Sequence, residues 1–513
     1  MKAVLAIDEG TTGVTALVLA EDGRLLGRGY EEITQHFPTP GEVEHDPDEL
    51  FGASVAAART ALGQAAVVPV ALGITNQRET VCVWERATGR PLHHAIVWQD
   101  RRTAARTQQL ARGPKASLIR TRTGLMLDPY FSASKIEWLL ERVPGLARRV
   151  AAGDAVFGTV DSWLLFRLTN GRSFATDHTN ASRTMLYNIV KHGWDDGLLD
   201  LFGVPRHALP EIAKSSWPFG LSAKEHLGAE IPITGMAGDQ QAALFGQGCV
   251  AAGQAKNTYG TGAFLLLNTG KRRPPSTRGL LTTIACGPAG EPVYALEGSV
   301  FIAGAAIQWL RDGLQLIATA ADTERLAREV PDTGGVYFVP AFVGLGAPHW
   351  EPEARGTIVG ITRGTTRAHL VRAAVEAMAF SVSDVLRAMT ADANLKLHAL
   401  QVDGGAAAND FLMEFQADLL GVPVERPDLV ETTALGAAGL AGLGAGVWKR
   451  PEDFLAGRNV KRFAPRRAGA ELRRQEAQWH RAVDAALSWA GAGAGAAAAG
   501  RGRKRRSAAR RRA

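Results

Sequence analysis

One acidic residue near the middle of the chain stands where it could do chemistry. Asp239 lies in the stretch Gly235-Met-Ala-Gly-Asp-Gln-Gln-Ala-Ala-Leu244, between glycines and a run of small residues that predicts the start of a helix. Glycines before a helix let the backbone turn sharply and leave the carboxylate at the end of an element, facing a cleft. Because a Gly-Asp pair before a helix is more often a simple N-cap, this stretch alone assigns no function.

A second candidate is a turn near the N-terminus. Residues 4–7 predict a strand, Asp8-Glu9-Gly10-Thr11-Thr12-Gly13 predicts a tight turn, and residues 14–20 predict a second strand. Backbone N–H groups and threonine hydroxyls in such a turn suit phosphate oxygens, while the Asp8 carboxylate suits a metal ion. A plain Gly-Thr hairpin is the alternative interpretation.

Polar residues also follow a buried strand directly. Residues 70–75 predict an apolar strand that runs into Asn76-Gln77-Arg78-Glu79-Thr80. Polar groups at the end of a buried strand are costly unless something pairs with them, so this pattern favours a binding site over a solvated turn.

The elements that must position these residues repeat along the chain. Residues 253–270 again predict strand, turn and strand, with Gly260-Thr261-Gly262 as the turn. Two such hairpins, each opening an α/β half, indicate an internal repeat with a phosphate held between the two Gly-Thr turns. Further on, residues 299–312 predict a helix containing Gly304, and Gly404-Gly405 predicts a turn between a strand and a helix.

Length and composition limit the class of protein. A chain of 513 residues with 46% hydrophobic residues is too large for one core and predicts two domains. The three cysteines, Cys82, Cys249 and Cys286, show no CxxC spacing, which argues against a disulfide framework or a zinc site. An acid at position 8 comes too early for a signal-peptide core, and the sequence holds no run of 18 apolar residues, so we expect a cytoplasmic protein without a membrane span.

The net charge of +7 comes from the C-terminus. Residues 501–513 carry eight of the 58 Lys and Arg residues and no acids, which leaves 50 basic against 51 acidic residues in the rest of the chain. The body therefore has no basic footprint for nucleic acid, and the purpose of the tail stays open. From residue 490 onward the chain is Gly/Ala-rich and then Arg/Lys-rich, a composition that cannot bury a core and predicts disorder.

Several motifs together resemble one known family. They are Gly73-Ile-Thr-Asn-Gln-Arg-Glu-Thr80, Ala95-Ile-Val-Trp-Gln99, Asp128-Pro-Tyr-Phe-Ser-Ala-Ser134, Gly238-Asp-Gln-Gln-Ala-Ala-Leu244, Thr258-Tyr-Gly-Thr-Gly262, Gly344-Leu-Gly-Ala-Pro348 and Asp403-Gly-Gly-Ala-Ala-Ala-Asn409. This set resembles the FGGY carbohydrate kinase family over nearly the whole chain except its tail, and it is most similar to the members that phosphorylate glycerol.

The resemblance implies a fold and an activity. The fold would be α/β, with two actin-like (ribonuclease H-like) ATPase domains around a central cleft, an N-terminal domain at 1–247 for glycerol and phosphate, a C-terminal domain at 248–489 for the nucleotide, and the disordered tail at 490–513. The activity would be ATP- and Mg²⁺-dependent phosphorylation of glycerol to sn-glycerol 3-phosphate, by a homo-oligomer (a dimer or tetramer).

The resemblance also implies a role for each site residue. Asp239 would be the general base, and with Asp8 would hold Mg²⁺. Glycerol would be bound by hydrogen-bonding groups and flat apolar walls, namely Arg78, Glu79, Trp98, Tyr130, Asp239, Gln240 and Phe264. The nucleotide would be bound by Thr11, Thr12, Gly13, Thr261, Gly304, Gln308, Gly405 and Asn409.

Two departures and two alternatives accompany this interpretation. Glu9 and Thr15 stand where many members have Gln and Arg, which predicts an added negative charge near the phosphates and one lost nucleotide contact. We expect weaker nucleotide binding or a compensating cation, not a different reaction. A kinase of the same family for another polyol or ketose is the first alternative function. A non-catalytic actin-like nucleotide switch is the second.

Overall fold

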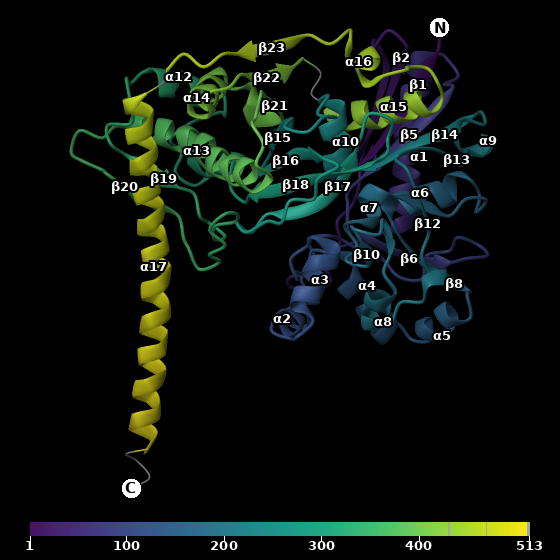
Figure 1. The fold of residues 1–513 in the computed structure, drawn as a ribbon, viewed down its shortest axis with the longest axis horizontal. Coiled ribbons are helices and arrows are strands. Elements are labelled where there is room, and N and C mark those ends of the chain that lie inside the picture. The colour runs from purple at the N-terminus through teal and green to yellow at the C-terminus, as the bar shows by residue number, and fades with distance from the viewer. Residues whose placement is uncertain (429–430, 468, 510–513) are drawn as a thin grey trace.

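The computed structural model describes residues 1–428, 431–467 and 469–509, with side-chain surroundings as far as Gly491. Two sheets, one from each half of the chain, organise the molecule (Figure 1). The first sheet has the order β13-β14-β5-β1-β2-β3. Its strands are β1 (Ala3–Glu9), β2 (Gly13–Ala20), β3 (Leu25–Glu32), β5 (Ala71–Asn76), β13 (Ser216–Leu221) and β14 (Pro232–Gly238).

The second sheet has the order β17-β18-β16-β15-β21-β22-β23. Its strands are β15 (Ala255–Tyr259), β16 (Ala263–Gly270), β17 (Leu281–Cys286), β18 (Pro292–Val300), β21 (Leu400–Asp403), β22 (Val424–Pro427) and β23 (Val460–Phe463). In both sheets three antiparallel strands (β1-β2-β3 and β15-β16-β18) continue through parallel neighbours (β5 then β14, and β21 then β22). The predicted internal repeat is therefore confirmed at the level of topology.

Strand β1 shows how this alternation sets the two faces of the first sheet. Leu5 and Ile7 belong to the core that packs against α1 (Pro47–Ala65), whereas Val4 and Ala6 belong to the core around α15 (Thr432–Gly444). Because successive side chains of a strand point to opposite faces, Asp8 falls on the α15 face and Glu9 on the α1 face. The two acids of the N-terminal turn thus have different surroundings.

Helix α15 comes from the second half of the chain but covers the first sheet. It crosses α10 (Asp239–Gly246) so closely that a Cβ on Gly436 would lie 1.9 Å from the Ala242 carbonyl oxygen, and one on Gly246 would lie 2.1 Å from the Thr432 oxygen. Only glycine permits that approach. The domain ranges 1–247 and 248–489 stay a prediction, and the second range includes a helix that packs on the first sheet.

An additional layer lies beside the first sheet, in the lower right part of Figure 1; the chain between β5 and β14 builds most of it, and β4, which precedes β5, joins it. A four-stranded sheet in the order β4-β7-β6-β8 stands at its centre. The strands are β4 (Glu44–His45), β6 (Val81–Glu85), β7 (Ala95–Ile96) and β8 (Ala155–Thr159), and the helices are α2 (Ala104–Ala111), α3 (Ala116–Thr123), α4 (Ser132–Arg142), α5 (Leu146–Ala151), α6 (Val160–Leu168), α7 (His178–Ala181) and α8 (Asp196–Phe202).

The remaining elements complete the two halves. Two-stranded pairs are β9 (Ala175–Asp177) with β12 (Glu211–Ala213), β10 (Tyr187–Asn188) with β11 (Gly193–Trp194), and β19 (Tyr337–Val339) with β20 (Thr357–Val359). The other helices are α9 (Lys224–Leu227), α11 (Gly304–Asp312), α12 (Asp322–Arg328), α13 (Arg367–Ala393), α14 (Asp410–Leu420), α16 (Pro451–Leu455) and α17 (Ala470–Ala509), with 3-10 turns at Arg206–Ala208 and Gly405–Ala408. The helix predicted at 299–312 begins later than expected, because β18 continues to Val300 as part of the second sheet.

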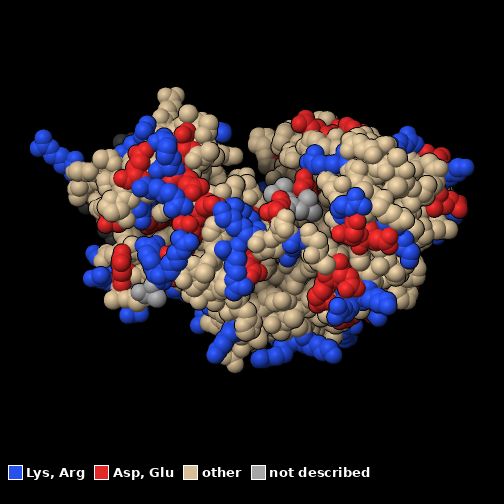
Figure 2. All heavy atoms as spheres, turned by 90° about the horizontal axis from the view of Figure 1, so that it is seen from above, with Lys and Arg blue, Asp and Glu red and all other residues tan. Residues whose placement is uncertain are grey.

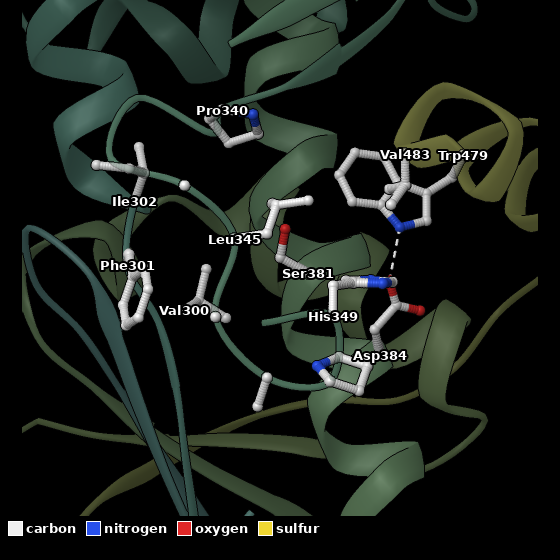
Figure 3. A pocket seen from close by; sticks show the side chains of 14 residues that line it. Val300, Phe301, Ile302, Pro340, Leu345, His349, Ser381, Asp384, Trp479 and Val483 are labelled. Carbon is white, nitrogen blue, oxygen red and sulfur yellow. Dashed lines mark hydrogen bonds between the residues drawn. The ribbon is translucent and has the colours of Figure 1, made fainter. Parts of the chain in front are cut away.

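Helix α17 docks on α13 through its first turns. Trp479 Nε1 donates to Asp384 at 2.8 Å (Figure 3). The His480 ring and Asp384 are 2.9 Å apart. Beyond this contact the helix extends away from both halves (Figure 1). Helix α17 runs to Ala509 and so enters the segment 490–513, whose composition predicts disorder; residues 510–513 lie outside the described residues.

Within the described part of the chain, no helix is long and apolar enough to cross a membrane. Acidic and basic side chains are intermixed over both lobes of the face shown in Figure 2, and the surface is hollowed between the lobes.

Candidate active site

Asp239 is the first residue of α10, and α10 lies between the two sheets. Leu244 of this helix packs with Leu266 of the second sheet, while Ala242 and Phe245 pack with the first sheet and α15. The Asp239 side chain is 32% exposed, and its Oδ1 accepts from the Gln240 backbone N–H at 2.7 Å. The carboxylate thus stands at a helix N-terminus, where the helix dipole favours a negative charge, and remains open to a ligand.

Arg78 and Glu79 lie at the end of β5, close to Asp239. Arg78 Nε forms an ion pair with Asp239 Oδ1 at 2.9 Å, although the guanidinium is only 2% exposed. Glu79 is buried and adopts a φ of 65°, a left-handed conformation that is uncommon for a residue with a side chain. Backbone strain of this kind is typical of functional sites, where the surroundings hold a residue in place.

Aromatic side chains join this polar group. The Trp98 and Tyr130 rings meet edge to face with centroids 5.4 Å apart, and Trp98 Nε1 donates to Thr11 Oγ1 at 2.9 Å. Lys135, which is fully buried, donates to the backbone carbonyls of Pro129 at 2.5 Å and Tyr130 at 2.8 Å. The loop that carries Tyr130 is therefore fixed by an amino group inside the protein.

The second sheet contributes one face to the same site. Cross-strand pairing of Thr258 with Phe264 and of Phe264 with Ser299 puts these side chains on the face that carries Leu266 and meets α10. Lys256, on the same face, donates to the Gln240 side chain and, at 2.8 Å, to Thr258 Oγ1. Gln240 of the first half thus contacts Lys256 on the same sheet face that carries Phe264.

The predicted nucleotide residues of the second half line one cleft of about 400 Å³. The members of the predicted set in this lining are Thr261, Gly304, Gln308, Gly405 and Asn409. Helix α11 begins against the Gly-Thr turn, since the Gly304 N–H donates to the Gly260 carbonyl oxygen at 3.0 Å and a Cβ on Gly304 would lie 2.6 Å from that oxygen. A cleft with glycines, a threonine turn and a helix N-terminus suits a phosphorylated ligand.

Asp8 and Asp239 are the carboxylates that could hold a metal ion. Burial, and next the negative charges of Asp239 and Glu431, raise the pKa of Asp8 to about 7. A divalent cation would relieve this repulsion between neighbouring carboxylates. The described residues hold no group of three or more His, Cys, Asp or Glu side chains placed to bind a metal ion. Mg²⁺ usually binds one or two carboxylates and takes its other ligands from water and phosphate oxygens, so Asp8 and Asp239 would suit it.

Glu9 does not face the phosphate turn as predicted. It is fully buried on the α1 face, Gln77 Nε2 donates to its two oxygens at 3.1 and 3.3 Å, and burial raises the pKa of this carboxyl well above its usual range. The face of β1 on which Glu9 lies thus removes one of the two grounds for weaker nucleotide binding; the other, Thr15 in place of an Arg, and the weaker binding itself stay predictions.

Four residues of the site were not predicted from the sequence: Lys135, Arg183, Lys256 and Glu297. All four are charged and buried. Glu297 stands alone in the mostly apolar strand β18, and this isolation was an available signal, because a lone charge in a buried element requires a partner. Lys135, Arg183 and Lys256 lie among other polar residues in the sequence, which hides them.

The fold and the site together define a class of protein. Two topologically equivalent sheets, a Gly-Thr hairpin opening each half, and a cleft lined by Thr261, Gly304 and Gly405 match the two-domain kinases built on the actin-like fold. The chain belongs to the FGGY family of carbohydrate kinases: the family's N-terminal domain matches residues 3–246 and its C-terminal domain matches residues 255–445.

Individual relatives narrow the comparison. The chain is 53% identical to glycerol kinase 2 of Thermotoga maritima, over 95% of this chain and 99% of that one, and 54% identical to a glycerol kinase of Dechloromonas aromatica, over 95% and 98%. Among solved structures it resembles Plasmodium falciparum glycerol kinase with ADP, with a TM-score of 0.91, 37% identity, and coverage of 95% and 98%. A xylulose kinase from Lactobacillus acidophilus, at 22% identity and a TM-score of 0.83, shares the fold.

Proposed function

We propose that this protein transfers the γ-phosphoryl group of ATP to a primary hydroxyl of glycerol, giving sn-glycerol 3-phosphate and ADP. The observation that carries the proposal is the position of Asp239, a partly exposed carboxylate beside the Arg78–Glu79 strand end and between the two sheets. The relatives at 52–54% identity over 95% of the chain are named glycerol kinases, which favours this acceptor over a pentulose.

Glycerol is small and carries three hydroxyls along a carbon edge. We assign Arg78, Glu79, Tyr130, Asp239 and Gln240 to the hydroxyls, and Trp98 and Phe264 to the carbon edge. A pocket that commits buried polar groups to each hydroxyl discriminates strongly against analogues that lack one, because those groups would lose their partners.

Asp239 acts as the general base in this proposal. Both of its contacts described above use Oδ1, so we assign Oδ2 as the oxygen that takes the proton from the attacking hydroxyl. Transfer of a phosphoryl group asks the protein mainly for positioning and charge neutralisation. Thr11, Thr12, Gly13 and Thr261 hold the β- and γ-phosphates, while Gly304, Gln308, Gly405 and Asn409 hold the rest of the nucleotide.

Asp8 and Asp239 would hold Mg²⁺ with the nucleotide. When bound, Mg²⁺ neutralises charge on the transferring phosphoryl group. A cytoplasmic location and assembly into a dimer or tetramer stay predictions of the sequence.

Replacing Asp239 by Asn tests the assigned base. Because general-base catalysis contributes about 10²–10⁴-fold, we expect Asp239→Asn to lower kcat by a factor in that range while the protein stays folded. Formation of glycerol 3-phosphate would be measured directly. Asp384→Asn, a change at the remote α13–α17 contact, serves as the matched control and should leave kcat within about twofold.

If Asp239→Asn phosphorylates glycerol as fast as the parent, Asp239 is not the base. A separate outcome, in which the parent itself forms no glycerol 3-phosphate, would favour the alternative of an actin-like nucleotide switch without catalysis.

A further inference from the structure

Glu297 is a charged residue in the middle of β18, in the second sheet, and it contacts two arginines of the first half. Arg78 Nη1 donates to Glu297 Oε2 at 2.7 Å and Arg78 Nη2 to Oε1 at 3.2 Å, while Arg183 Nη2 donates to Oε1 at 3.0 Å. Burial alone would raise the pKa of Glu297, but the two guanidinium groups outweigh it and lower that pKa to about 2. Glu297 is therefore a carboxylate shared by both arginines.

The four charges form one closed group. Arg183 Nε donates to Glu79 Oε1 at 2.6 Å, so Arg183 bridges Glu79 and Glu297, and Glu297 bridges Arg183 and Arg78. The side chains are between 0 and 5% exposed, with two positive and two negative charges. A buried group of this kind is stable only while every charge keeps its partner.

This group holds the residues that we assign to the acceptor. Arg78 and Glu79 are both members of it, and Arg78 also makes the ion pair with Asp239. Arg183 lies with its guanidinium carbon 5.8 Å from the centroid of the Tyr130 ring. The geometry of three acceptor residues thus depends on Glu297, which comes from the other half of the chain.

We infer that Glu297 is a positioning residue for acceptor binding: through Arg78 and Arg183 it fixes the groups that recognise the hydroxyls of glycerol. The inference rests on the proposed function, because it names what holds the acceptor groups in place. A change at Glu297 should affect binding of the acceptor and not of the nucleotide, since the cleft lined by Gly304 and Gly405 does not include Glu297.

The test is Glu297→Gln, which keeps the length of the side chain and removes its charge. We expect the KM for glycerol to rise on the order of tenfold or more while the KM for ATP stays within about twofold, because Arg78 and Arg183 lose their shared anion and reorient. A purely structural role would not raise the KM for glycerol selectively over the KM for ATP.

The chain offers a matched control. Arg372 and Glu376 form a buried ion pair at 2.7 Å within α13, with side chains 6% and 4% exposed. Glu376→Gln should lower the Tm by an amount comparable to Glu297→Gln but leave the KM for glycerol unchanged. A similar rise in that KM for Glu376→Gln would overturn the inference, because it would trace the effect to general destabilisation.

Other outcomes are equally decisive. A folded Glu297→Gln protein whose KM for glycerol stays within twofold, or whose KM for ATP rises as much, contradicts the role assigned to Glu297. Where Glu297→Gln does not fold, Glu297→Asp keeps the charge but shortens its reach, and the same two Michaelis constants decide. If the parent prefers another acceptor, the proposed function fails and the variants are assayed with that acceptor; a parent inactive on every acceptor overturns both.

Discussion

Trp98 joins two parts of the site through a single hydrogen bond. Its ring meets Tyr130 on the acceptor side, and its Nε1 donates to Thr11 Oγ1 in the N-terminal turn that we assign to the phosphates. Trp98 therefore fixes the position of the acceptor-pocket wall relative to the phosphate turn, because it contacts both.

Trp98→Phe separates these two roles, because phenylalanine keeps an aromatic wall and removes the donor. A lost hydrogen bond of this kind costs about 0.5–1.5 kcal/mol, so we expect kcat/KM for ATP to fall about two- to tenfold while the KM for glycerol changes less. Steady-state kinetics with each substrate varied in turn would measure this.

Trp163→Phe is the control for the loss of an indole donor, since Trp163 Nε1 donates to the Pro47 carbonyl oxygen in the core near α1. Equal losses in kcat/KM for ATP in both variants would contradict the role given to the Trp98–Thr11 bond.

The types and spacing of residues in the sequence predict most of the site. The other site residues are recognised only from the contacts that they make in the fold. Arg78, Asp239 and Thr261 stand at element ends next to glycines or polar runs, where a motif is visible in the sequence. Glu297 sits in the strand Pro-Val-Tyr-Ala-Leu-Glu-Gly-Ser-Val, and only the fold brings Arg78 and Arg183 against it. The sequence predicts the Glu9 charge near the phosphates, but in the fold this side chain lies on the α1 face of β1. The difference arises because strand register decides which face each residue occupies.

At the scale of elements, the crossing of α10 and α15 positions Asp239, which we assign as the general base. Asp239 begins α10, and the glycine contacts at Gly246 and Gly436 set how deeply that helix sits against α15. A side chain at the crossing would push α10 away from the first sheet and carry Asp239 with it.

Gly436→Ala tests this coupling. Because its Cβ would lie 1.9 Å from the Ala242 oxygen, we expect a loss of about 1–3 kcal/mol in the free energy of unfolding together with a lower kcat. Gly52→Ala provides the contrast: Gly52 is exposed within α1 and has no atom within 4 Å of its added Cβ, so this change should stabilise the protein by about 0.5–1 kcal/mol without altering kcat. Denaturant unfolding and kinetics on both proteins would measure this, and a Gly436→Ala variant with unchanged stability and kcat would refute the packing argument.

Local pattern predicted the hairpins but not the placement of α15. The strand-turn-strand periodicity of residues 4–20 and 253–270 appears directly as β1-β2 and β15-β16, since alternation and turn glycines are local signals. Helix α15 is almost uniformly small and apolar, Thr-Thr-Ala-Leu-Gly-Ala-Ala-Gly-Leu-Ala-Gly-Leu-Gly, so its sequence has no polar face that would show which sheet it covers.

At the scale of the whole molecule, the C-terminal part of α17 stands apart from the site. The helix is attached to the body through Trp479 and His480, and the basic residues lie beyond residue 500. We therefore expect deletion of residues 490–513 to leave kcat/KM for glycerol and for ATP within about twofold, because the deletion removes no residue of the site.

Kinetics of the truncated and full-length proteins, with their oligomeric state measured alongside, would check this expectation. Loss of activity or of assembly would show that the tail has a role in the working enzyme that its composition does not predict.

The acceptor itself is the most direct test of the central claim. ADP release from MgATP would be measured with glycerol, dihydroxyacetone, erythritol and xylulose, beside a control without acceptor. We predict the highest kcat/KM with glycerol and little ADP without an acceptor. A much higher kcat/KM with erythritol or xylulose, or ADP release that is independent of any acceptor, would contradict the assignment of this protein as a kinase that acts on glycerol.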